Sequence, residues 1–322
     1  MKKIALCFLI SYDHILNKED IWREWIEHNT DIINVYFHYT DYNKIQSEWI
    51  KQHVLPQPFI AKTTYFHVVP AYMSTLFYAM KSDEDNQWFC FLTDSCVPII
   101  TPEKFRKKFM KNQTQSIMRW KPAWWNVCVS KRANLAKLSK EYHIGNDPWF
   151  ILCKEDAMTC NYFAFSEVNL FSLICKGGLA NESIFIIMLK KYNKHHTIIN
   201  EITHAADWDR MSSDTSPYVF REATNENIRW IDQTLKKNKE VMFLRKVDSS
   251  FPNEILEKYC KSKNTVSEHK HKNKNRNALF SCIPNPPLGY IVVGLFCILV
   301  FSCIFTVINI STSYHSQYMS QM

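Results

Sequence analysis

The first 251 residues alternate between short apolar runs and longer stretches with helical periodicity. The sequence predicts strands at Ile4–Ile10, Ile33–His38, Trp88–Leu92, Ser116–Trp120 and Phe150–Cys153, and helices at Lys18–His28, Tyr65–Met80, Pro102–Asn112, Ser130–Glu141, Lys154–Phe163 and Asn181–Tyr192. This alternation is typical of an α/β fold, in which helices cover both faces of an open sheet. Ligands of such sheets bind at the carboxyl ends of the strands, so the residues that follow the strands are the candidates for function.

The C-terminal part has a different pattern. Leu288–Ile310 contains no charged residue, and as a helix it is long enough to span about 30 Å of hydrocarbon. We therefore expect a globular domain over residues 1–255, a basic flexible linker over 256–286, one transmembrane helix over 287–310 and a polar tail over 311–322. The tail has no Lys or Arg, so the positive-inside rule predicts a tail-anchored, single-pass membrane protein with its domain in the cytosol. The lumen of the Golgi or endoplasmic reticulum is the alternative.

The N-terminal run MKKIALCFLI has the outline of a weak secretory signal. It is short and lacks a cleavage site of small residues, which favours a buried first strand instead.

The net charge of +8 lies largely between Lys258 and Arg276, where seven Lys or Arg stand against the single acid Glu268. The rest of the chain is close to neutral, so we expect no nucleic-acid partner. Contact of the basic linker with nucleic acid or anionic lipid is a more remote alternative.

The eleven cysteines form no CxxC pair. Five of them stand inside apolar runs, namely Cys7, Cys90, Cys153, Cys297 and Cys303. This pattern argues against a disulfide scaffold or a zinc module and favours buried, reduced thiols.

Several motifs of well-known enzyme classes are absent from the sequence. It has no GxGxxG after the first strand, no GxxxxGK[ST], no HExxH and no GxSxG, so dinucleotide oxidoreductases, P-loop NTPases, zincins and serine hydrolases lose their main support. Asp83-Glu84-Asp85 precedes a strand instead of following one, and we interpret it as a solvated loop.

Six segments at the predicted strand ends and helix starts resemble one family together. They are VYFHYTD (35–41), FCFLTDSCVPI (89–99), DPWFILCKEDA (147–157), ANESIF (180–185), HAADW (204–208) and MFLRKV (242–247). In this order they are similar to the Tyr-x-His-x-Asp, FxxLSExxxPL, GSQWFxLxRxxA, PDExxF, VDW and LFARKF segments of the core-2/I-branching β-1,6-N-acetylglucosaminyltransferase family.

The resemblance implies a single GT-A-like catalytic domain. It implies an inverting glycosyltransferase that uses a UDP-sugar, with GlcNAc as the first expectation and xylose as another, and a glycan, glycoprotein or glycolipid acceptor. Members of the family work without a metal ion, so no cofactor is expected.

The resemblance also assigns roles to single residues. Glu182 matches the family's catalytic base, and Lys246 with Arg245 would neutralise the leaving diphosphate. Arg221 is the candidate for a second upstream cation, with Arg229 nearly as good. The remaining assignments are His38 and Asp41 beside the uridine and ribose, and Trp208, Asp94 and Trp149 in the acceptor site.

The chain departs from the family pattern at two places. Asn181 stands where the family has an aspartate before the glutamate, and Asn146-Asp147-Pro148 replaces its glycine-serine pair. These changes motivate a second hypothesis, a membrane-anchored binding or scaffold protein on a catalytically decayed fold.

Overall fold

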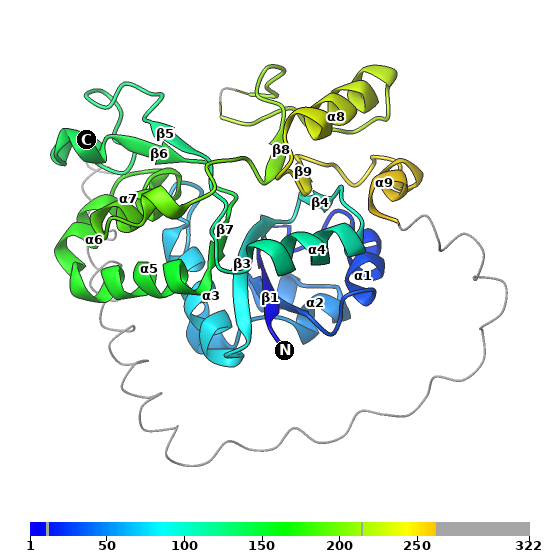
Figure 1. Cartoon of the computed structure of the whole chain (residues 1–322), viewed down its shortest axis with the longest axis horizontal. Helices are drawn as coiled ribbons and strands as arrows, with labels where there is room; N and C mark the ends of the chain where they lie inside the picture. Colours follow the sequence, from blue (N-terminus) through cyan, green and yellow to red (C-terminus); the bar gives the residue numbers. More distant parts are fainter. Residues whose placement is uncertain (11–12, 214, 262–322) are drawn as a thin grey trace, which may run out of the picture. The chain divides into compact units, whose positions relative to one another are not determined.

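The computed structural model describes residues 1–10, 13–213 and 215–261 (Figure 1). Its strands are β1 (Lys3–Leu9), β2 (Ile33–His38), β3 (Asn86–Thr93), β4 (Val97–Pro98), β5 (Trp120–Pro122), β6 (Ile144–Asn146), β7 (Ile151–Cys153), β8 (His204–Ala206) and β9 (Phe243–Arg245). Its α-helices are α1 (Glu19–Glu27), α2 (Glu48–Gln52), α3 (Val69–Ser82), α4 (Pro102–Asn112), α5 (Lys154–Ser166), α6 (Val168–Cys175), α7 (Ile184–Lys191), α8 (Asn225–Lys237) and α9 (Asn253–Cys260). The predicted α/β class is confirmed.

The main sheet has the strand order β2-β1-β3-β7. Strands β1, β2 and β3 are parallel, and β7 pairs antiparallel with β3. In β1, Ala5, Leu6 and Cys7 are fully buried, as expected for a parallel strand that is covered on both faces. A second sheet has the order β4-β9-β8, and β5 pairs with β6 in a two-stranded sheet.

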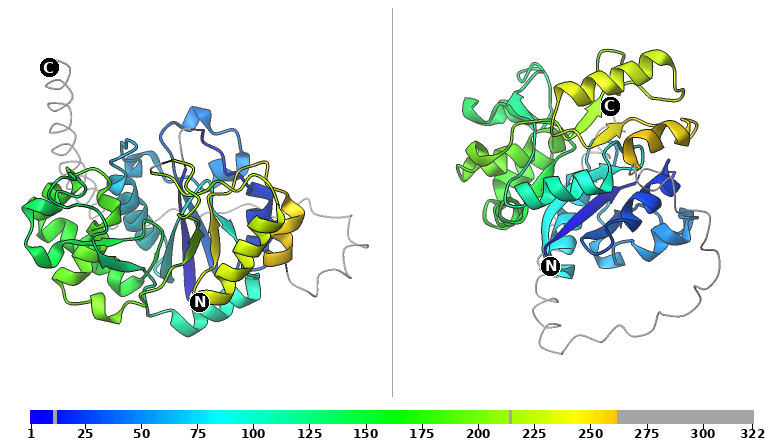
Figure 2. Two further views of the ribbon diagram at one scale, coloured as in Figure 1. Left: turned by 90° about the horizontal axis from the view of Figure 1, so that it is seen from above. Right: turned by 45° about the vertical axis from the view of Figure 1, so that its right-hand side comes forward.

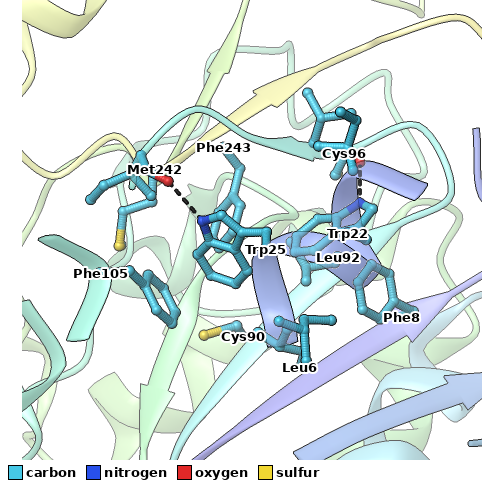
Figure 3. Close-up of a cluster of buried hydrophobic side chains, with 14 of the residues drawn as sticks. Leu6, Phe8, Trp22, Trp25, Cys90, Leu92, Cys96, Phe105, Met242 and Phe243 are labelled. Carbon is cyan, nitrogen blue, oxygen red and sulfur yellow. Dashed lines mark hydrogen bonds between the residues drawn. The ribbon is translucent and has the colours of Figure 1, made fainter. Parts of the chain in front are cut away.

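One face of the main sheet packs against α1 and α4 (Figure 3). Alternate residues of the central strands point to this face, among them Phe8, whose ring meets that of Trp22 edge-on at 5.0 Å. Both tryptophans of α1 are buried, and their indole N–H groups donate to backbone carbonyls: Trp22 to Cys96 at 2.8 Å and Trp25 to Ile100 at 2.7 Å. These bonds satisfy the polar atoms that burial would otherwise leave unpaired.

The opposite face is covered by α3, with α5 and α7 beside it (Figure 2). The ring of Tyr72 in α3 stacks on Phe91 of β3 at 4.9 Å, and Phe150 and Phe185 complete the aromatic layer. The predicted arrangement of an open sheet between helices is thus observed in the described residues.

Several predicted elements are confirmed. Strand β2 and helix α4 have the bounds that the sequence predicts, and Thr101 caps α4, where its hydroxyl accepts from the Lys104 N–H. The buried cysteines are also as predicted: Cys7, Cys90 and Cys153 are free thiols inside the core, whereas Cys297 and Cys303 lie outside the described residues.

Other predictions are wrong. No helix spans Ser130–Glu141; the segment has two 3-10 turns, because Ala133 and Asn134 both adopt positive φ. The expected strand Ser116–Trp120 is reduced to isolated bridges at Ile117 and the start of β5. The expected helix Asn181–Tyr192 begins later as α7, after the 3-10 turn Ala180–Glu182.

The compact unit extends to Lys261. Helix α9 buries Leu256 and Cys260, so the domain boundary expected at residue 255 falls inside this helix. In the part of the chain that the structure describes, no helix is long and apolar enough to cross a membrane. The predicted transmembrane helix (287–310), tail (311–322) and most of the predicted linker lie outside that part.

Candidate active site

A cleft of about 290 Å³ opens at the carboxyl ends of β1, β2 and β3. Leu9 and Ile10, Thr40, and Thr93 bring the three strand ends to its wall. Seven of the predicted site residues line this cleft: His38, Asp94, Trp149, Glu182, Trp208, Arg245 and Lys246. The fold therefore brings together residues from His38 to Lys246, which are more than 200 positions apart in the sequence.

Glu182 is the last residue of the 3-10 turn before α7, and its side chain is 17% exposed. Burial raises the pKa of its carboxyl, and the nearby Asp147 carboxylate raises it further. The Arg132 guanidinium, 3.1 Å from Oε2, opposes both effects. A partly desolvated carboxylate with one cationic partner is suited to accept a proton.

The turn that carries Glu182 is held from three sides. The Leu179 N–H donates to the Phe66 carbonyl at 2.8 Å, and the Gly178 carbonyl accepts from the Ala133 N–H at 3.0 Å. The buried Asn146 amide donates to the Asn181 carbonyl at 3.0 Å. Asn146, one of the departures from the family pattern, is thus the residue that ties β6 to the turn.

Gly177 lies where this turn meets the Asn134 backbone. A Cβ added there would lie 2.3 Å from the Asn134 backbone nitrogen, whereas at Gly178 the nearest atom would be 3.7 Å away. We expect Gly177→Ala to lower the stability by about 1–3 kcal/mol, because the backbone must move to admit the methyl group. Thermal unfolding of this variant beside Gly178→Ala checks it: equal melting temperatures would contradict the close packing.

Arg245 is the last residue of β9, Lys246 follows it, and both line the cleft. The Arg245 guanidinium donates through Nη1 to the hydroxyls of Thr93 and Ser95, and its Nε is buried without a partner. Neither cation forms an ion pair with any residue that the structure describes. Two cations without counter-ions in a cleft can bind an anion such as a diphosphate.

Trp149 and Trp208 lie on one wall with their rings nearly parallel, 20° apart, and their centroids separated by 6.5 Å. They differ in exposure: Trp208 is 46% exposed and Trp149 only 7%. The Arg245 guanidinium lies 4.2 Å over the Trp149 ring. Trp149 therefore packs against the Arg245 guanidinium, whereas the exposed Trp208 ring can contact a sugar.

His38 is buried and its Nε2 accepts the Ala61 N–H at 3.0 Å. Burial lowers the pKa of His38 to about 4, so the ring is neutral at physiological pH. A neutral ring that accepts at Nε2 carries its proton on Nδ1.

Three predicted residues, Arg221, Arg229 and Asp41, lie away from the cleft. The Arg221 side chain is 68% exposed, lies 3.8 Å from Asp248 and does not line the cleft. Arg229 is also exposed, on α8. Asp41 does not line the cleft; its carboxylate caps a 3-10 turn by accepting from the Asn43 N–H. Position along the chain could not tell these side chains from those that turn inward.

Arg132 and Asp147 are not among the site residues predicted from the sequence. Burial raises the pKa of Asp147 to about 6, against the opposing charges of Arg119 and Lys121. Arg132 stands in a segment that was predicted to be a helix, so no signal pointed to the cleft. Among the described residues, no group of three His, Cys, Asp or Glu could hold a metal ion. In the acidic segment Asp83-Glu84-Asp85, the Asp83 carboxylate accepts hydrogen bonds from Lys3 and Asn34.

Comparison with known proteins supports the resemblance found in the sequence. The family model described as Branch, Core-2/I-Branching enzyme, matches residues 5–232. No curated protein matches the chain. The match covers more than half of the chain and includes the ends of β1, β2 and β3 at the cleft, together with Glu182. The chain therefore belongs to the Core-2/I-Branching enzyme family, whose members are glycosyltransferases.

Proposed function

We propose that the domain, with a GT-A-like fold, transfers a sugar from a UDP-sugar to an acceptor hydroxyl with inversion and without a metal ion. GlcNAc is the first candidate for the sugar and xylose the second. One observation carries the proposal: a partly buried carboxylate, Glu182, shares a cleft with two cations, Arg245 and Lys246, that form no ion pair with any described residue.

The chemistry needs one base and one anion site. Glu182 accepts the proton of the acceptor hydroxyl as its oxygen attacks the anomeric carbon. The bond from that carbon to the diphosphate breaks on the opposite side, which inverts the configuration. Arg245 and Lys246 stabilise the charge that develops on the departing diphosphate, and Trp208 contacts the acceptor sugar.

Arg132 positions the Glu182 carboxylate and favours its ionised form. Its positive charge lowers the pKa of Glu182, so removing the charge raises that pKa. Because Glu182 acts in its deprotonated form, the acid limb of the pH profile of kcat/KM should move to higher pH in Arg132→Gln. Lys131→Gln, which removes the neighbouring exposed cation, should leave the limb in place. An unchanged acid limb in Arg132→Gln would show that this ion pair does not set the protonation of the catalytic group.

We also propose that the run 287–310 anchors the protein in a membrane as a single-pass helix. The tail without Lys or Arg supports a cytosolic domain, and the Golgi or endoplasmic reticulum lumen is the alternative. The acceptor would then be a glycan, glycoprotein or glycolipid near that membrane.

Calorimetric titration of the full chain with UDP, UDP-GlcNAc, UDP-xylose and UDP-glucose in EDTA tests the function. Micromolar binding in chelator is expected and identifies the donor. Binding only after Mn²⁺ is added would contradict the metal-free mechanism. Absence of binding to every donor would favour the binding or scaffold protein suggested by Asn181 and Asn146.

A further inference from the structure

We propose that the acceptor carries an anionic group, and that a basic surface with exposed tryptophan next to Glu182 binds it. This surface, called here the basic tryptophan surface, consists of Arg119, Lys121, Trp124 and Trp125. The inference deepens the proposed function and rests on it.

The basic tryptophan surface adjoins the turn of Glu182 at Gly145. Gly145 lies opposite Lys121 in the β5–β6 pair (Figure 1). A methyl group built on Gly145 would lie 2.7 Å from the Trp124 ring, 2.9 Å from the Trp125 ring and 3.1 Å from the Glu182 carbonyl oxygen. Glycine therefore lets both indoles approach the turn that carries the proposed base.

Arg132 makes a second connection between the two. Its guanidinium bonds to Glu182 at 3.1 Å and lies 5.2 Å over the Trp125 ring. An acceptor whose hydroxyl reaches Glu182 would thus extend along the tryptophans on one side of the carboxylate.

Trp124 has the form of a stacking platform. It is 46% exposed although its ring packs edge-on against Trp125 at 4.7 Å, and the Lys121 ammonium lies 4.9 Å from the centre of its ring. A sugar can place its apolar face on such an indole while an acidic substituent meets the adjacent ammonium.

The charge of this surface is local. Arg119 and Lys121 are exposed and form no ion pair with any described residue. The nearby carboxyl groups are those of Asp147 and Glu182; burial raises the pKa of both, and the charges of Arg119 and Lys121 lower the pKa of Asp147 in opposition. Since the sequence is close to neutral outside residues 258–276, unpaired cations beside the proposed base do not follow from a generally basic domain. They favour an anionic acceptor and steer it toward the site.

The test uses the full chain with three acceptor probes that keep the same disaccharide: a lactoside, its 3′-sulfate and its 3′-sialylated form. Binding is followed by tryptophan fluorescence at low and high salt, with UDP binding measured in parallel. We expect at least one of the two anionic forms to bind about tenfold more tightly than the neutral one, and the advantage to shrink in high salt. Sulfate and carboxylate are distinguished by which of the two binds.

Two variants locate the effect. Lys121→Gln should remove most of the preference for the anionic form, while Lys107→Gln, which removes an exposed charge from α4, should keep it. UDP binding should be the same in both. Equal affinity for neutral and anionic forms, binding of none of them, or a preference unaffected by Lys121→Gln would overturn the inference. Loss of UDP binding in the unsubstituted chain would instead overturn the proposed function.

Discussion

Glu182→Gln is expected to lower kcat by about 10²–10⁴-fold, the usual contribution of a general base. The amide keeps the size of the side chain and can still accept from Arg132, but it cannot take the proton of the acceptor hydroxyl. Affinity for the UDP-sugar should stay within a few-fold, because the proposed donor contacts lie on Arg245 and Lys246. Initial rates with saturating donor and acceptor, beside calorimetry with UDP, give both values.

The matched control is Glu141→Gln. Glu141 is exposed and bonds to the Ser139 hydroxyl, and it does not line the cleft. Its variant should keep full activity. If Glu182→Gln retained normal turnover, another group would have to act as the base, and the assignment of Glu182 would be wrong.

Loss of a cation at the cleft should weaken donor binding. We expect Arg245→Met and Lys246→Met each to raise the Kd for UDP by about 30-fold, or about 2 kcal/mol, because a partly buried diphosphate would lose its counter-charge. Methionine keeps part of the side-chain stem, so the loss reports mainly on the charge. Calorimetry over a range of salt concentrations should show a weaker salt dependence in both variants.

Arg221→Met serves as the control for these variants. The sequence offered Arg221 as a diphosphate contact, whereas the structure places it on the surface beside Asp248. Its substitution should therefore leave the Kd for UDP unchanged. A large effect at Arg221 together with normal binding in Arg245→Met would show that the donor lies elsewhere.

Much of the fold could be predicted from local patterns. The bounds of strand β2 agree with the prediction, because a mostly apolar segment ends at His38 and is followed by polar residues. Helix α4 was recognised from Thr101 and Pro102, whose cap and restricted backbone act on the nearest turn alone. The prediction was wrong where distant contacts fix the backbone. Within the expected helix Ser130–Glu141, Ala133 and Asn134 have left-handed conformations and donate hydrogen bonds to the Gly178 and Leu173 carbonyls.

The sequence by itself determined the α/β class, the order of the six family segments and the identity of Glu182, Arg245 and Lys246 as candidates. The α/β class follows from the alternation of strand and helix patterns along the chain, whereas the three candidate residues follow from the resemblance of the six segments to the family. Only the tertiary structure decided which side chains face the cleft. In the structure, Arg221 lies on the surface and Trp149 packs against Arg245. Arg132 bonds to Glu182, which lies 50 residues further along the sequence. The reason is physical: side-chain direction and burial depend on packing between distant elements, which local periodicity does not encode.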